Sequence, residues 1–298
     1  MQYKVSIKRK CYLLSVLLMT VWLTGCVQEE FESTPSPAGN GIRFTLTVPD
    51  VNLPSVSSRT MTGTGTAKKE DEIETVDILV FDMSKTPAVF LEWVSATGVT
   101  QDLADNSTVS FSAVLSPTTA STCIVVVANK ELDNIVSGFT KGATTKVEAM
   151  EKMLHTQTGK WLADGSTTGG YTRIPMYGEK VISKITPSMD PITGINMKRM
   201  LARIDIRNNS ATSNFTVEEV YLANYNTTGY IAPAWNTNGQ VTDPVPDTPV
   251  LPAGSGKMTE EGDAILYSVN GNTPYDGEIY TFESLAAEDA GGAGADGD

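Results

Sequence analysis

Histidine, cysteine and basic residues are scarce in this sequence of 298 residues, and each shortage excludes a class of function. The one histidine, His155, has no cysteine at ligand spacing, so a histidine-based metal site is not expected. The sequence also lacks a phosphate-binding Walker loop, a dinucleotide-binding fingerprint and the G-x-S-x-G motif of serine hydrolases. We therefore expect no metal, no cofactor and no enzymatic activity.

Basic residues are outnumbered by acidic ones, 22 against 35, which gives a net charge of −13. Residues 1–25 contain four of the basic residues and none of the acidic ones, so their removal leaves 18 against 35, a net charge of −17. Affinity for nucleic acid depends on cationic contacts with phosphates. We therefore expect no nucleic-acid partner, and the acidic balance favours a soluble surface protein.

No apolar run in the sequence is long enough to span a bilayer, which takes roughly 20 residues. Residues 12–22 form a short apolar stretch behind a basic segment, as in a signal peptide. The stretch leads into Leu23-Thr24-Gly25-Cys26, which resembles the bacterial lipobox. The pattern predicts a lipoprotein signal peptide over residues 1–25 and a lipidated Cys26 that holds the mature chain at a membrane surface. The alternative is an ordinary secretory signal with a chance cysteine.

The remaining cysteines do not form a disulfide framework. Cys11 lies within the predicted signal peptide, and Cys123 begins the apolar run 123–128. This run predicts a buried strand, in which Cys123 is an inert core residue rather than a nucleophile. We expect no disulfide within the mature chain.

Alternating apolar residues mark the first strand of the fold. Residues 26–41 are a polar tether, and Ile42, Phe44, Leu46 and Val48 then occupy every second position. This period of two predicts an amphipathic strand over residues 42–48. Further strands are predicted over 72–82, 89–94, 108–115, 123–128, 179–185, 195–206, 215–222, 229–232, 264–269 and 278–284.

One helix is predicted among these strands. Thr145 and Glu148 have the spacing of a capping box, in which the two side chains bond to free backbone amides at the helix start. Val147 and Met150 follow at helical spacing. The pattern predicts a short amphipathic helix over residues 145–155.

Many short strands separated by turn residues predict a mainly β fold of the sandwich class. The length of the mature chain suggests two domains. We assign residues 42–207 to an N-terminal sandwich with the helix, and residues 208–285 to a C-terminal β domain. The second domain is short, and an incomplete domain is the alternative. The Gly-rich, acidic residues 286–298 predict a disordered tail.

The order of these features resembles the fimbrillins of the Bacteroidetes, the family of major and minor subunits of type V pili. The resemblance covers most of residues 20–233. It implies a fold of two tandem transthyretin-like β-sandwich domains. The pieces that carry it are, in chain order, the lipobox at Cys26, strand 42–48, the loop around Arg59, and the segments 70–82, 173–178, 195–208 and 215–233.

The resemblance implies a mechanism of assembly. The subunit would reach the cell outer membrane as a lipoprotein, and an arginine-specific protease would cut after Arg59 in the loop 49–71. Strand 42–48 would then leave, and an extended segment of another subunit would replace it in a fimbria that supports adhesion to a host or bacterial surface receptor. Lys68-Lys69 is a second trypsin-like site in the same loop.

Elementary energetics supports this step independently. Each of the four apolar side chains of strand 42–48 contributes about 1.5–3 kcal/mol when buried. Their removal would cost roughly 6–12 kcal/mol as an upper estimate, and would leave unpaired backbone groups that template the addition of a strand. A head-to-tail contact of this kind produces an open filament.

Two alternatives stay open at this stage. In both, the protein is a non-polymerising surface lipoprotein, in which Arg59 is an ordinary loop residue and strand 42–48 is a permanent edge strand. The first alternative is a fimbrial anchor, and the second is a glycan-binding sandwich. Exposed aromatic residues would serve the glycan-binding role, and the candidates are Trp93, Trp161, Trp235 and Tyr230. The acidic C-terminus also departs from the family, whose members donate a β-rich C-terminal segment. Three explanations stay open: the chain is truncated, it accepts a strand without donating one, or the donor is an internal strand such as 264–269 or 278–284.

Overall fold

A computed structural model describes residues 41–48, 71–101, 108–161, 172–206, 219–241, 250–253, 264–268 and 275–284. All of them belong to one unit, Asn40–Asp298. The fold is mainly β, as the sequence predicts. Its centre is a sandwich of a four-stranded and a five-stranded sheet, whose facing side chains form one hydrophobic core.

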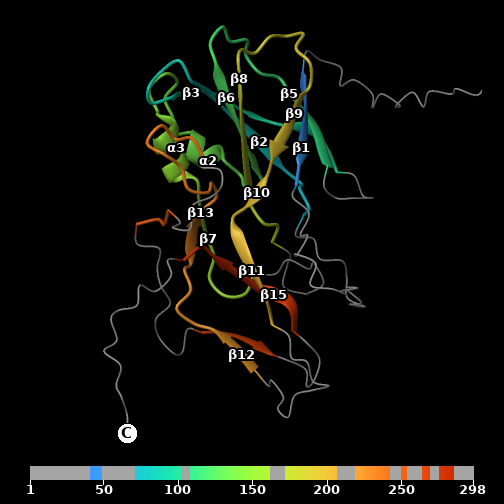
Figure 1. Cartoon of the computed structure of the whole chain (residues 1–298), viewed down its shortest axis with the longest axis vertical. Helices are drawn as coiled ribbons and strands as arrows, with labels where there is room; N and C mark the ends of the chain where they lie inside the picture. The colour runs from blue at the N-terminus through green and yellow to red at the C-terminus, as the bar shows by residue number, and fades with distance from the viewer. Residues whose placement is uncertain are drawn as a thin grey trace, which may run out of the picture. The chain divides into compact units, whose positions relative to one another are not determined.

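The four-stranded sheet has the order β4–β5–β1–β9. Its strands β1, β5 and β9 are labelled in Figure 1. It contains β1 (Ile42–Thr47), β4 (Thr97–Gln101), β5 (Thr108–Ala113) and β9 (Ile192–Asn196). Alternation of apolar and polar residues turns one face of each long strand toward the core. Strand β4 was not predicted, because its sequence TGVTQ contains one large apolar residue and so lacks the alternation of a half-buried strand.

The five-stranded sheet has the order β10–β8–β6–β2–β3. Its strands are β2 (Val76–Asp82), β3 (Val89–Ser95), β6 (Thr122–Ala128), β8 (Met176–Ile182) and β10 (Lys198–Arg199). Strand β6 is buried at all seven positions, and β2 at six of seven. Both strands have a core on either side, which agrees with the apolar runs 78–81 in β2 and 123–128 in β6.

A second core covers the outer face of this sheet. The side chains of Leu79 and Phe81 from β2 pack there against Met150 and Met153, at the helix α3 (Lys146–Lys152). The predicted capping box is confirmed, since the Thr145 hydroxyl accepts from the Glu148 amide and the Glu148 carboxylate accepts from the Thr145 amide. The helix therefore begins where the sequence indicates.

The end of this helix differs from the prediction of residues 145–155. Helix α3 ends at Lys152, and β7 (Leu154–Thr156) follows, paired antiparallel with β13 (Thr228–Tyr230). A partner strand distant in sequence thus overrides the local helical spacing. The structure also adds a four-residue helix, α2 (Asp133–Val136).

The predicted strand 195–206 is divided in the structure. Buried Met197 and Met200 separate β9, β10 and β11 (Leu201–Ile206), and each of the three strands joins a different sheet. A single-sequence pattern gives the extended conformation of such a segment but not its changes of partner.

The C-terminal part of the described chain contains pairs of strands. Strand β12 (Glu219–Leu222) pairs with β14 (Ile265–Ser268), and β11 pairs with β15 (Tyr275–Phe282). The predicted domain boundary at 207/208 lies outside the described residues, so the division into two domains stays a prediction. The signal peptide, the tether and the tail at 286–298 also lie outside them. Within the described ranges, no helix has the length and apolar character needed to cross a bilayer.

The capping box gives a first test of the fold. Thr145→Ala removes the hydroxyl that accepts from the Glu148 amide, and we expect a loss of about 1 kcal/mol in the free energy of unfolding. The matched control is Thr119→Ala at an exposed position, with an expected change within about 0.5 kcal/mol. Urea unfolding of the two variants measures both; equal losses would contradict the capping role.

Candidate functional site: the slot occupied by β1

Strand β1 lies in the interior of its sheet, with a partner on each side. It runs antiparallel to β5 and parallel to β9. The edge position in the alternative is therefore wrong, whereas the permanence of the strand stays an open alternative. Loss of β1 would leave a slot with two open walls, β5 and β9, rather than one trimmed edge.

The four predicted side chains of this strand all enter the core. Ile42, Phe44, Leu46 and Val48 are each at most 4% exposed and belong to the cluster between the two sheets. Phe44 stacks on Phe111 of β5, with ring centroids 5.0 Å apart and an angle of 6° between the planes. The structure thus confirms the burial of this face. Its removal stays a prediction.

The β5 wall is held from its far side by β4. Strand β4 pairs antiparallel with β5, and the hydroxyls of Thr97 and Thr100 donate to the carbonyls of Ser112 and Ser110, both over 3.3 Å. The opposite edge of β5 is the one that pairs with β1. This wall would therefore keep a paired neighbour after β1 had left.

The β9 wall is held by the other sheet. Lys180 of β8 donates from Nζ to the carbonyl of Thr193. Gly178 lets the two strands approach closely, because a Cβ atom at this position would lie 2.7 Å from Met197 Sδ and 2.8 Å from Ile195 Cγ2. A side chain at position 178 would push the wall outward, so glycine is required there.

The predicted processing sites cannot be placed beside this slot. Cys26 and Arg59 both lie outside the described residues, as does most of the loop 49–71. Lipidation of Cys26 and cleavage after Arg59 therefore stay predictions.

A buried ion pair links the helix to the outer face of the five-stranded sheet. Lys146 is fully buried, and its ammonium group bonds to the Glu179 carboxylate of β8. The same carboxylate accepts from the Tyr177 hydroxyl over 2.7 Å and from the Val241 amide over 3.0 Å. Burial, and next the charge of Glu179, raise the pKa of Tyr177 well above its usual range, so this hydroxyl stays protonated and donates.

Sequence reasoning missed this network, because Glu179 lies 33 residues from Lys146 and 62 residues from Val241. The only local signal was a lysine at the first helical position, directly after the N-cap, where basic residues are disfavoured by the helix dipole. The network joins α3, β8 and the segment at Val241, and its role is structural, because its charges are paired within the protein.

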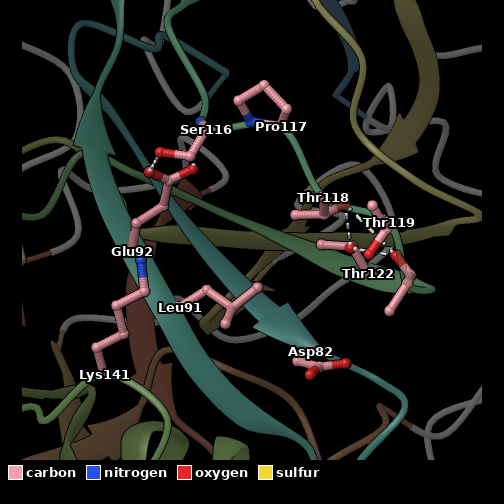
Figure 2. A pocket seen from close by; sticks show the side chains of 10 residues that line it. Asp82, Leu91, Glu92, Ser116, Pro117, Thr118, Thr119, Thr122 and Lys141 are labelled. Atoms are coloured by element: carbon pink, nitrogen blue, oxygen red, sulfur yellow. Dashed lines mark hydrogen bonds between the residues drawn. The ribbon is translucent and has the colours of Figure 1, made fainter.

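A surface pocket of about 270 Å³ lies near β2, β3 and the loop before β6 (Figure 2). Its carboxylates are already engaged. Glu92 accepts from the Ser116 amide over 2.7 Å and hydroxyl over 2.6 Å, and Asp82 accepts from Ser84. None of the ten lining residues is aromatic. The pocket therefore offers no stacking platform of the kind expected for glycan binding.

The four aromatic candidates for glycan binding pack mainly against protein. Trp161 is buried and donates to the Thr172 carbonyl over 2.9 Å, and Trp93 packs on the outer core. Tyr230 and Trp235 form an edge-to-face pair with centroids 5.0 Å apart. Their packing is that of residues in the core or at its rim.

Cys123 is a buried core residue, as predicted. Burial raises the pKa of its thiol to about 12, so the reactive thiolate is not formed near neutral pH. No cluster of potential metal ligands occurs in the described residues.

The range matched by a known family coincides with this sandwich. The sequence model of the family described as "Major fimbrial subunit protein (FimA)" matches residues 42–193, from the first residue of β1 into β9. This range is just over half of the 298 residues. The chain belongs to this family. It is therefore a fimbrial protein of the cell surface whose partners are other fimbrial subunits.

Solved structures with some similarity to this member of the fimbrial family come from two organisms. A fimbrial assembly protein of Parabacteroides distasonis is 11% identical, with a TM-score of 0.41 over 83% of this chain and 79% of its own. A candidate cell adhesion protein of the same organism is 18% identical, with a TM-score of 0.45 over 84% and 73%. A candidate polysaccharide-binding protein of Bacteroides thetaiotaomicron is 11% identical, with a TM-score of 0.31 over 64% and 60%. No curated protein matches the fimbrial chain.

The buried ion pair gives a test of the scaffold behind the slot. Glu179→Gln leaves the Lys146 charge buried without its counter-charge, and we expect a loss of about 3–5 kcal/mol in the free energy of unfolding. The combined change Lys146→Met and Glu179→Gln removes both charges and should recover much of this loss. Exposed Glu131→Gln is the control. A loss below about 0.5 kcal/mol for Glu179→Gln in urea unfolding would overturn the structural role.

Proposed function

We propose that the chain is a non-catalytic structural subunit that is exported as a lipoprotein, cut after Arg59 and polymerised by replacement of β1. Cys26 anchors the precursor in the outer membrane through its lipid after removal of residues 1–25. The observation that carries the proposal is the position of β1, which is both the first described strand and an interior strand of the sandwich.

The order of the chain supports cleavage as the trigger. Among the described strands, only β1 precedes Arg59 in sequence. A cut after Arg59 therefore frees β1 from the rest of the chain without breaking any other described strand. Before the cut, β1 is held at high effective concentration by its own linker, and an external strand cannot compete.

The energetics support exchange rather than simple loss of the strand. Removal of four buried apolar side chains costs roughly 6–12 kcal/mol as an upper estimate, close to the whole stability of an ordinary domain. An empty slot is therefore unfavourable, and a donor strand that refills it restores both the core and two rows of backbone hydrogen bonds. The same argument makes the assembled contact long-lived.

The donor comes from another subunit in this proposal. The internal candidates 264–269 and 278–284 overlap β14 and β15, which are paired with β12 and β11 within the chain. A contact between a slot on one subunit and a strand of the next is heterologous, so it propagates into a filament. Adhesion to a host or bacterial surface receptor is the function that such a filament would serve.

The proposal is tested by the fate of the Arg59→Ala chain in cells that assemble the wild-type chain into fimbriae. We expect export and labelling of Cys26 with palmitate to be unchanged, because the signal is intact. We expect assembly to fall to background, because β1 stays tethered. Electron microscopy and the size of surface polymers in denaturing gels without heating give the measurement.

The matched control replaces Lys68 and Lys69 with alanine in the same loop. This chain should be cut and assembled normally, because the proposed scissile bond is intact. Normal assembly of the Arg59→Ala chain would overturn the proposed cleavage. A cleaved wild-type chain that remained a monomer would instead favour a non-polymerising anchor.

A further inference from the structure

The slot occupied by β1 can distinguish more than the alternation of apolar and polar residues in a strand. A strand with apolar residues at every second position can slide by two residues and still turn the same face inward. Sliding of this kind would place Leu46 opposite Phe111 instead of opposite Val109. Two features of the walls surround the strand, and the second of them distinguishes these registers.

The first feature is a bulge in the β9 wall. Phe44 lies opposite Ile192, and Leu46 lies opposite Ile195, so Thr193 and Gly194 together face one residue of β1. Gly194 has a φ of +71°, in the left-handed region that favours glycine. The bulge interrupts the ladder at one point of the wall and sets Ile192 and Ile195 three residues apart opposite the strand, in every register that the strand adopts.

The second feature is the aromatic stack on the β5 wall. Phe111 lies directly opposite Phe44, and their rings are nearly parallel at 5.0 Å. The next inward position along β1, Leu46, is fully buried opposite Val109. The wall thus presents one aromatic and one small aliphatic residue in a fixed order.

We propose that the slot selects its donor by the position of an aromatic ring: the incoming strand has an aromatic residue at the place of Phe44 and an aliphatic residue at the place of Leu46. This inference rests on the proposed exchange of β1 and names the chemistry of the strand that replaces it. The donor is an extended segment with the order aliphatic–x–aromatic–x–aliphatic–x–aliphatic, bound in the register of β1.

The physical reason is a difference of fit rather than of hydrophobicity. A donor with the two residues exchanged has the same composition and the same alternation. It loses the stack on Phe111 and forces a ring into a packed position opposite Val109. Both effects weaken binding in the same direction, and together we expect at least about a tenfold change in Kd.

The experiment uses the full chain cleaved after Arg59, with two labelled peptides of residues 40–50. One has the natural order, and the other combines Phe44→Leu with Leu46→Phe. Each peptide is titrated into two cleaved chains, the natural one and one that combines Val109→Phe with Phe111→Val. Fluorescence anisotropy gives the four Kd values.

We expect the natural peptide to bind the natural slot at least about tenfold more tightly than the exchanged peptide, and the exchanged walls to reverse this preference. Equal binding of both peptides to both chains would overturn the inference and leave strand exchange standing. Absence of binding by either peptide to the natural cleaved chain would overturn the exchange of β1 itself, and the inference with it.

A second measurement does not depend on cleavage. In the uncleaved chain, the pair Phe44→Leu and Leu46→Phe should lower the unfolding midpoint in urea, and addition of Val109→Phe and Phe111→Val should recover part of the loss. In the combined variant, the two rings again lie opposite each other, now at positions 46 and 109, two residues along each strand. The pair on β1 and the pair on β5 are also measured alone. A combined variant whose midpoint falls by the sum of these two losses would contradict the inference that the wall selects the position of the aromatic residue.

Discussion

The sandwich depends on the packing of β1 between β5 and β9. Its four apolar side chains fill the middle of the core that joins the two sheets, while its backbone pairs on both sides. An edge strand can fray at the loss of one row of hydrogen bonds, but an interior strand can leave only if both rows and the core contacts are lost together. In the proposed exchange, the strand is therefore either fully in place or fully replaced.

The scaffold around β1 is held in part by contacts that do not involve this strand. Strands β2 and β6 have a second core on their outer face, where α3 and the pair of Lys146 with Glu179 lie. Gly178 and the bond from Lys180 to the Thr193 carbonyl hold the β9 wall against β8. The second core thus contains no residue of β1. A fimbrial subunit that exchanges its first strand needs such a partition of stability between an exchangeable and a permanent part.

The sequence allowed prediction of the parts whose signals are local. The structure contains the amphipathic strand predicted at 42–48, the fully buried strand predicted at 123–128 and the capping box at Thr145. What could not be predicted depends on distant partners. The interior place of β1, the division of 195–206 among three sheets and the bond of Lys146 to Glu179 each require knowledge of which segments meet. The stack of Phe44 on Phe111 belongs to the same class, because its partners are 67 positions apart in the sequence.

The most direct test of the account is hydrogen exchange of the backbone amides in the chain cleaved after Arg59, before and after release of the fragment that contains β1. The account predicts that release removes protection from β5 and β9, leaves β2 and β6 protected, and that added peptide 40–50 restores the lost protection. Unchanged protection of β5 and β9 after release would contradict it, because the slot would then be stable without any strand inside.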